Sequence, residues 1–251
     1  MVTPGGLSML LPIGVFIAFA LLERFGRGYV WPEEPHWVLR GIIWTVIIIW
    51  FGRVFGELIR HHLQPYTLMD LSGLGLWGII PSLIVYELLI YGYHRALHGV
   101  PILWRMHQWH HSSERLDVWS TYRVHPLEIT GYVMISYGIS GGILGVTGGT
   151  AFWTGIVILF IQTIQHTNIK TPVWLSYIIM RPEAHMLHHA RDKHHANYSD
   201  FPIIDALFGT FEMSEDAPEA VGFWNGASRQ IGPLIRGQDV TTPLAGARGD
   251  A

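Results

Sequence analysis

The sequence predicts an all-α membrane protein, a bundle of about four to five membrane-spanning segments that is capped on the cytoplasmic side by a histidine-rich helical segment. Three observations lead to this prediction. Of the 251 residues, 49% are hydrophobic and only 14% are charged, whereas a soluble domain carries about 25% charged residues. Several apolar runs are long enough to cross a bilayer. Finally, 12 of the 15 histidines lie between His94 and His195.

Composition excludes several classes of function. The net charge of -3, without a long basic block, argues against nucleic acid as a partner. With no cysteine in the chain, disulfides, iron–sulfur clusters and cysteine nucleophiles are excluded. No glycine-rich phosphate loop and no nucleophile elbow is present, so an enzyme built on this sequence must take electrons from another protein.

The chain length fits a single domain, residues 1–251. Within it we expect N-terminal membrane segments (1–66), a histidine-bearing catalytic region (67–212) and a C-terminal cytoplasmic tail (213–251). The tail becomes polar and rich in glycine and alanine beyond about Gly237, where we expect a loose conformation.

The first three apolar segments differ in length. Residues 1–22 are uncharged and lack the basic start and small-residue cleavage site of a signal peptide, so we expect a first span. The run "GIIWTVIIIW" at 41–50 is shorter, and predicts either a second span with snorkelling ends or a buried helix. Residues 71–93 are long enough to span and carry only Glu87 as a charge.

The longest apolar segment, residues 129–165, has no charged residue. A single helix of this length would be about 55 Å long, against a hydrocarbon core of about 30 Å. The glycines of "GVTGG" at 145–149 break the run, so we predict a hairpin of two helices. The hairpin returns the chain to its starting face and places His125 and His166 on the same side of the membrane.

Arginines predict the orientation of the bundle, because cytoplasmic loops carry an excess of basic residues. Four of them follow the third apolar segment, so the histidine-rich side and the C-terminus are predicted to be cytoplasmic: Arg95, Arg105, Arg115 and Arg123.

Three compact motifs, called the histidine boxes below, carry most of the histidines: His94-x-x-x-His98, His107-x-x-His110-His111 and His185-x-x-His188-His189. On a helix, positions i, i+3 and i+4 lie on one face, so each box is expected to aim its imidazoles in one direction. Imidazole suits iron, zinc, copper and nickel, whereas hard cations prefer oxygen ligands. The boxes therefore predict a helical metal site, with a solvated histidine-rich surface as the alternative.

Eight box histidines exceed the roughly four to six ligands of one metal, so two ions are predicted. His166, in "QHTNI", is expected as a ninth ligand carried by the returning arm of the hairpin. Two redox metals at the aqueous edge of the bundle would be accessible to electrons, while a lipid substrate enters from the bilayer.

Four stretches resemble the fatty acid hydroxylase and sterol desaturase superfamily: "HRALHGVPILWRMHQWHHSSERLD", "RVHPLE", "QHTNI" and "HMLHHARDKHHANYSDFPIIDALFGTF", within about residues 90–212. This superfamily consists of integral-membrane, non-haem di-iron enzymes. The resemblance implies two iron ions, with zinc as a substituting metal, and O2 as co-substrate. It also implies nine metal ligands: His94, His98, His107, His110, His111, His166, His185, His188 and His189.

Six further residues are candidates for supporting or additional ligand roles: Glu87, His125, His194, His195, Asn197 and Asp205. Glu87 is seven residues before His94 and so lies on the same helix face, although a buried salt bridge to Arg95 or Arg123 is the alternative. His125 precedes a proline and either caps a helix or supports a ligand. Asp205 either orients a ligand histidine or caps a turn.

Three functions are compatible with these features. The first is a membrane-bound, O2-dependent lipid hydroxylase or desaturase that acts on a C–H bond of a fatty acyl, sterol or related lipid and receives electrons from an external reductase or electron-transfer protein. The second is a metal transporter, which would need an ionisable path through the spans, where only Glu87 is found. The third, a haem protein, would place single ligands on facing helices instead of clusters.

Overall fold

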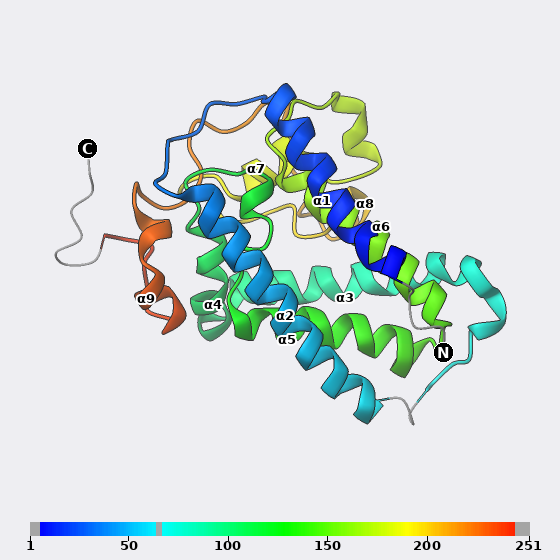
Figure 1. Cartoon of the computed structure of the whole chain (residues 1–251). Coiled ribbons are helices and arrows are strands. Elements are labelled where there is room, and N and C mark those ends of the chain that lie inside the picture. The colour runs from blue at the N-terminus through cyan, green and yellow to red at the C-terminus, as the bar shows by residue number, and fades with distance from the viewer. Residues whose placement is uncertain (1–5, 64–66, 244–251) are drawn as a thin grey trace.

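The computed structural model describes residues 6–63 and 67–243, and the regular secondary structure in these ranges is helical (Figure 1). Two isolated β-bridges, Arg27–Ile169 and Ala190–Val221, join segments far apart in the sequence. The all-α prediction is confirmed. Long helices form one part of the molecule, and short helices joined by loops form the other.

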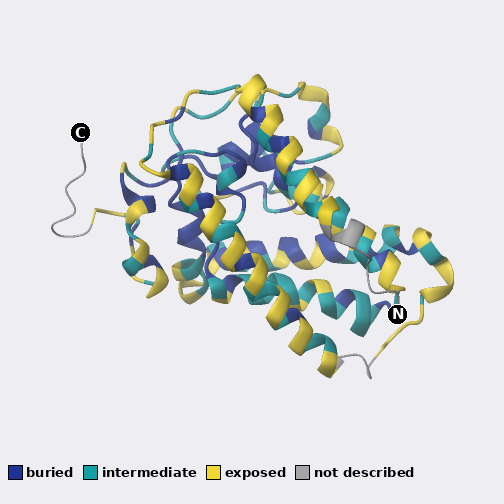
Figure 2. Cartoon of the chain, viewed as in Figure 1, coloured by how far each residue is buried: buried dark blue, intermediate teal, exposed yellow. Residues whose placement is uncertain are grey.

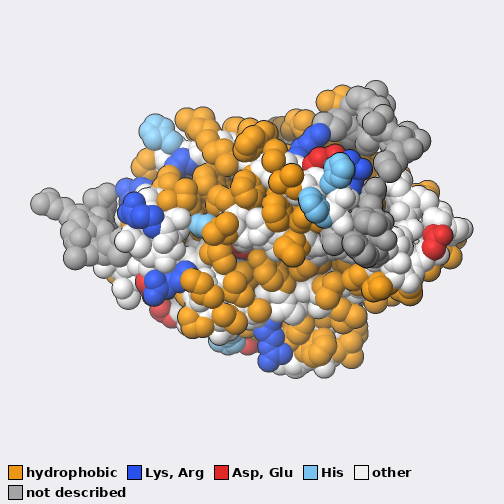
Figure 3. Space-filling model, turned by 90° about the horizontal axis from the view of Figure 1, so that it is seen from below, with side chains coloured by type: hydrophobic (Ala, Val, Ile, Leu, Met, Phe, Trp, Pro, Cys, Tyr) orange, Lys and Arg blue, Asp and Glu red, His pale blue; other side chains and the backbone are white. Residues whose placement is uncertain are grey.

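Within the described residues, three helical segments are long and apolar enough to cross a membrane. The first is α2 (Trp37–Leu63), the second runs from η1 (Ser72–Gly78) into α3 (Ile79–Gly99), and the third is α6 (Gly148–His166). Only 11% of the α2 window is buried, which favours the span over the buried helix for residues 41–50. Hydrophobic side chains cover much of the face seen from below, and charged ones lie mainly near its margins (Figure 3).

The predicted first span begins in residues 1–5, which lie outside the described residues, and its remainder forms α1 (Gly6–Gly26). Helix α1 packs against α6 and against η2 (Val118–Ser120). Its Glu23 carboxylate accepts a hydrogen bond from the Val118 amide, which fixes the end of α1 to the histidine-bearing side of the molecule.

The predicted hairpin is present. Helix α5 (Pro126–Tyr137) continues into a π-helical turn, η3 (Gly138–Ile143), and α6 starts at Gly148 after a break at the predicted glycines. Gly145 has a positive φ of 56°, and the Thr147 side chain caps α6. Helix α5 is not among the three candidate spans found within the described residues. The count of four to five spans stays a prediction, because the first expected span begins outside those residues.

Short helices surround the histidines, and a proline sets the start of each. Helices α4 (Pro101–His111), α7 (Pro182–His188) and α8 (Pro202–Leu207) all begin with proline, as does α5. Proline is favoured at the first helical position because its fixed φ suits a helix and its missing N–H would have no partner there. Pro101 starts α4 directly after the end of α3 at Gly99. The chain turns back at Val100, and the two helices pack together.

The segment after residue 213 packs against the molecule through η5 (Ala227–Arg229) and α9 (Ile231–Ile235). Trp109 of α4 forms a hydrophobic cluster with Phe223, Ala227, Leu234 and Val240. Val240 is fully buried, which differs from the loose conformation expected beyond Gly237, while residues 244–251 lie outside the described ranges. Apolar contacts made by a few residues in this polar segment account for the difference.

Burial is concentrated around α4 and α7, whereas α1 and α2 remain largely accessible (Figure 2).

Candidate metal centre

The nine histidines predicted as ligands come together in two groups, and in each group one ring nitrogen of every histidine lies within 4.8 Å of the others. We call them the five-histidine group and the four-histidine group. The first contains His94, His98, His107, His111 and His188, and the second contains His110, His166, His185 and His189. Helices α3, α4, α6 and α7 supply eight of them and His189 directly follows α7, so the centre joins elements that lie between residues 79 and 189.

The first box places both of its imidazoles in one group, as predicted, but the second and third boxes divide theirs between the two groups, contrary to the prediction. His107 and His111, four residues apart, enter the five-histidine group, but His110 between them enters the other. Likewise His185 and His189 share the four-histidine group, while His188 joins the first. Positions i+3 and i+4 lie on opposite sides of residue i around the helix axis. One box therefore contributes to both groups, and the two groups lie next to each other.

Ring nitrogens within the groups face each other at short distances. The Nε2 atoms of His94 and His107 are 3.1 Å apart, and those of His110 and His166 are also 3.1 Å apart. The His185 Nε2 lies 3.0 Å from His166 Nε2. Two nitrogen ligands about 2.1 Å from one metal and at right angles to each other would be about 3.0 Å apart. These separations fit a shared cation.

Backbone carbonyls hold three of the rings from behind. The Nδ1 atoms of His94, His166 and His188 lie 2.7 Å, 2.7 Å and 2.6 Å from the carbonyl oxygens of Tyr198, Gln162 and Ala196 respectively. A carbonyl oxygen only accepts, so each Nδ1 carries the proton and donates it. The Nε2 atom of each ring is then left with a lone pair directed into the centre.

A carboxylate that the sequence analysis missed holds a fourth ring. Glu128 of α5 is completely buried, and its Oε1 accepts a hydrogen bond from His107 Nδ1 at 2.8 Å. A carboxylate behind a metal-binding histidine raises the basicity of the ligand and fixes its orientation. The available signal was the charge immediately before the uncharged run 129–165, in a segment that also carries His125.

The donor chemistry fits a metal. Several ring nitrogens are buried without a hydrogen-bond partner in the described residues, among them His98 Nε2, His111 Nε2 and His188 Nε2. Buried polar atoms without partners are rare unless an ion or another group fills the site. Burial lowers the pKa of five ligand candidates well below the usual imidazole range, which keeps them in the neutral form that binds metals: His110, His111, His185, His188 and His189.

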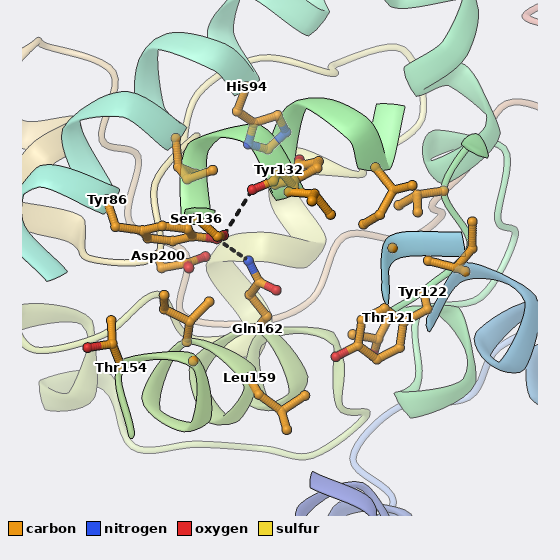
Figure 4. A pocket seen from close by; sticks show the side chains of 18 of the residues that line it. Tyr86, His94, Thr121, Tyr122, Tyr132, Ser136, Thr154, Leu159, Gln162 and Asp200 are labelled. Carbon is orange, nitrogen blue, oxygen red and sulfur yellow. Dashed lines mark hydrogen bonds between the residues drawn. The ribbon is translucent and has the colours of Figure 1, made fainter. Parts of the chain in front are cut away.

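A cavity of about 600 Å³ extends from the histidines between the apolar helices. Its inner end is lined by His94, His107, His110, His166 and His185, which belong to both groups. Figure 4 shows the His94 ring at one side of the cavity, above side chains of α3, α5 and α6. The remaining wall is mainly aliphatic and aromatic, with a few hydroxyl, amide and carboxyl groups.

Comparison with known proteins identifies the family. The sequence model named fatty acid hydroxylase matches residues 79–210, more than half of the chain. This chain belongs to the fatty acid hydroxylase family. The match runs from the start of α3 to just beyond the end of α8 and includes all nine grouped histidines.

Curated members of this superfamily are similar over part of their length. An ornithine lipid hydroxylase of Rhizobium tropici is 31% identical over 137 residues, which cover 53% of this chain and 41% of that protein. Human alkylglycerol monooxygenase is 28% identical, covering 61% and 35% of the two chains. A very-long-chain aldehyde decarbonylase of Oryza sativa subsp. indica is 29% identical, covering 70% and 29%. The chain thus spans less than half the length of these relatives. No solved structure matches it significantly.

Three other histidines predicted near the site have different surroundings in this family member. His125 is the N-cap of α5, where its Nδ1 accepts from the Leu127 amide and its Nε2 donates to the Ile235 carbonyl, which is the helix-cap alternative. His194 lies against the five-histidine group, with its Nδ1 3.1 Å from His111 Nδ1, and burial lowers its pKa to about 4. His195 lies at the surface, 3.5 Å from Glu212.

Two further candidates, Asp205 and Asn197, make hydrogen bonds to the backbone. Asp205 does not orient a histidine directly, because its two oxygens accept from the Tyr198 and Ser199 amides, and so it fixes the loop whose carbonyl holds His94. Asn197 ties the same loop to the backbone of Ala184 and Glu212.

Glu87 bonds a different partner from the two arginines that the sequence suggested. Its Oε2 accepts a hydrogen bond from the Asp200 amide at 3.0 Å. Arg95 donates to the Tyr91 hydroxyl, and Arg123 donates to Ser113 and to the Ser228 carbonyl, so the two arginines proposed as salt-bridge partners are engaged elsewhere.

Proposed function

We propose that this chain is a membrane-bound, non-haem di-iron enzyme that uses O2 to oxidise a C–H bond of a lipid, with hydroxylation as the favoured outcome. The main support for this proposal is the cavity, whose apolar wall leads from the candidate membrane-spanning helices to histidines of both groups. A ligand cavity of roughly this size and character is typical of sites for long apolar molecules. The relatives named as a hydroxylase and a monooxygenase support hydroxylation.

The two histidine groups would each hold one iron, and the all-nitrogen donor set also suits zinc as a substituting metal. Iron so bound would supply the activation of O2 that an unactivated C–H bond requires. The chain's own contribution is to fix the rings through Tyr198, Gln162, Ala196 and Glu128, so that little reorganisation is needed when a metal binds.

Substrate positioning is the second task of the chain. The apolar walls from α2, α3, α5 and α6 would exclude water and hold an alkyl chain in one path. Because Ile90 and His94 lie one helical turn apart on α3 and both line the cavity, a chain packed on Ile90 would reach the histidines directly.

The sequence also supports a proposal for the orientation of the chain in the membrane and for the source of electrons. We infer that the histidine groups and the C-terminus face the cytoplasm, because arginines are concentrated in the chain that follows α3. Without a dinucleotide-binding motif in the sequence, a separate reductase or electron-transfer protein would deliver the electrons from that side.

The test combines metal analysis with isotope labelling. Protein purified from iron-supplied cells should contain about two irons per chain without haem absorbance. Membranes supplied with a reductase system and ¹⁸O2 should yield a lipid product carrying one ¹⁸O atom. In the variant His107→Ala, one ligand of the five-histidine group is lost, and both the product and part of the iron should disappear.

The matched control is His61→Ala, at the exposed end of α2, which should leave iron content and product unchanged. Two results would contradict the proposal. The first is wild-type protein with two irons that oxidises no lipid of the acyl, sterol or ether classes. The second is metal uptake into vesicles that depends on the histidines, which would favour the transporter.

A further inference from the structure

One wall of the cavity carries a cluster of polar side chains that hold none of the grouped histidine rings. Tyr86 of α3, Gln162 of α6 and Asp200 of the loop before α8 all line the cavity, and Figure 4 shows them converging near its middle. The Gln162 amide donates to the Tyr86 hydroxyl at 3.0 Å. Gln165, one turn further along α6, donates to Asp200 Oδ1 at 2.8 Å.

The second oxygen of this carboxyl group is unsatisfied. Asp200 is 5% exposed, and its Oδ2 has no hydrogen-bond partner in the described part of the chain. Behind it, Glu87 accepts the Asp200 amide hydrogen through Oε2, and Glu87 Oε1 is also buried without a partner. Leaving a buried acceptor unpaired costs about 1–3 kcal/mol, and more for a charged group, so a group that donates to Asp200 Oδ2 would be favoured.

The cluster is close to the metal centre. Gln162 precedes His166 by one helical turn, about 6 Å along the axis, and its carbonyl oxygen holds the His166 ring. A group bound at Asp200 would therefore lie only a few bonds away from the part of the substrate at the four-histidine group.

We propose that Tyr86, Gln162 and Asp200 form a polar subsite that selects lipids carrying a hydroxyl group or an amide N–H near the carbon that reacts. The donor of the lipid would bind Asp200 Oδ2. The Tyr86 hydroxyl, which can both donate and accept, would bind the oxygen of the same group. A plain alkyl chain would leave the carboxylate unpaired in an apolar cavity, and so would bind more weakly.

This inference rests on the proposed function, because it takes the cavity to be the lipid site, but its test does not need turnover. The probes are hexadecan-1-ol and hexadecane, which differ in one hydroxyl group. Each is equilibrated without O2 between phospholipid nanodiscs that contain the metal-loaded protein and empty nanodiscs. The excess bound by the protein gives an apparent Kd for each probe.

Wild-type protein should bind the alcohol more tightly than the alkane by about tenfold, as expected for a hydrogen bond to a charged group. Tyr86→Phe, Gln162→Leu and Asp200→Asn should each reduce this preference by about threefold or more, with unchanged alkane binding and metal content. If Asp200→Asn does not fold, the other two variants still test the subsite.

The control is Tyr91→Phe, which makes the same chemical change in a buried tyrosine of the same helix. Tyr91 bonds Thr210 and Arg95 and stacks on Phe208. It should keep the wild-type preference. Equal binding of both probes by the wild type, or variants that lose both probes equally, would overturn the subsite and leave the cluster as a structural contact. Lipid oxidation in the presence of such a result would leave the proposed function standing.

Discussion

The buried pair of Glu128 and His107 shows how one residue outside the histidine boxes affects the whole centre. Glu128 Oε2 is buried without a hydrogen-bond partner in the described residues, so the charge is balanced only if the centre is positive. A cation bound by His107 and its neighbours would supply that positive charge. The carboxylate would then act on the metal through the imidazole ring that lies between them.

Glu128→Gln tests this role. The amide keeps the size of the side chain and retains an oxygen acceptor for His107 Nδ1, but it removes the charge. We expect metal affinity to fall by about 10- to 100-fold, measured by competition with a chromophoric chelator, while the thermal unfolding of the metal-free protein changes little. Glu57→Gln, at an exposed position of α2, is the control. Equal affinities for all three proteins would show that Glu128 serves only to pack α5 against α4.

At this scale the sequence predicted which histidines come together better than it predicted the groups that hold them. Eight of the nine grouped histidines were predictable because imidazoles at spacings of three and four residues have few other uses on a mostly apolar chain. His166 was predictable from its place at the end of the returning hairpin arm. Glu128 escaped prediction because its partner is 21 residues away. Asp205 was predicted as a support, but it acts through the Tyr198 backbone, and a bond between a side chain and a distant peptide group leaves no spacing pattern.

Among the elements, the α5–η3–α6 hairpin depends on one backbone position. The tip of the hairpin pairs with residues 68–71, since the Leu68, Met69 and Leu71 amides donate to the carbonyls of Gly142, Ile143 and Leu144. Gly145 follows directly, with φ of 56°, and a Cβ there would lie 2.5 Å from the Met69 carbonyl oxygen. Only glycine fits both the conformation and the space.

Gly145→Ala should therefore destabilise the hairpin by about 1–3 kcal/mol, because alanine adds left-handed strain and a steric clash. Differential scanning fluorimetry in detergent should show a lower Tm than wild type. Gly138→Ala is the control, since a Cβ at this helical position meets nothing within 4 Å. A Tm that is the same in both variants would mean that the tip separates from residues 68–71 without cost.

The sequence predicted the existence of the helices better than their ends. A break was expected because a 37-residue helix does not fit a bilayer, and the glycines at 145–149 indicated its position correctly. In contrast, the apolar run 41–50 gave no sign that α2 continues to Leu63, since its last turns contain Arg60, His61 and His62. Helix α3 also extends beyond its apolar part, so that His94 and His98 lie on the spanning helix itself and not after it.

For the whole molecule, labelling can show on which side of the membrane the start of α6 and the segment after α8 lie. The sequence contains no cysteine, so single-cysteine variants need no background removal. We predict that Gly148→Cys, at the exposed start of α6, reacts with an impermeant maleimide from the extracytoplasmic side. Glu215→Cys, exposed in the segment after α8, should react from the cytoplasmic side.

Labelling of right-side-out and inverted vesicles distinguishes the outcomes. Reaction of both cysteines from one side would show that α5 and α6 form a re-entrant pair and do not cross the bilayer. Reaction from opposite sides, but in the reverse sense, would place the histidine groups outside and would exclude a cytoplasmic electron donor.

The packing of the C-terminal segment on α4 also determines when the centre can be completed during synthesis. Gln108 lies between two of the grouped histidines, and its side-chain oxygen accepts the amide hydrogen of Val240, 132 residues later. Trp109 is likewise enclosed only when Phe223, Leu234 and Val240 pack against it. A ribosome that has just produced α4 must therefore translate all the helices described after it before this side of the centre is closed. A metal ion that arrives earlier would meet a partly open helix, so we expect stable binding only after Val240 has been synthesised.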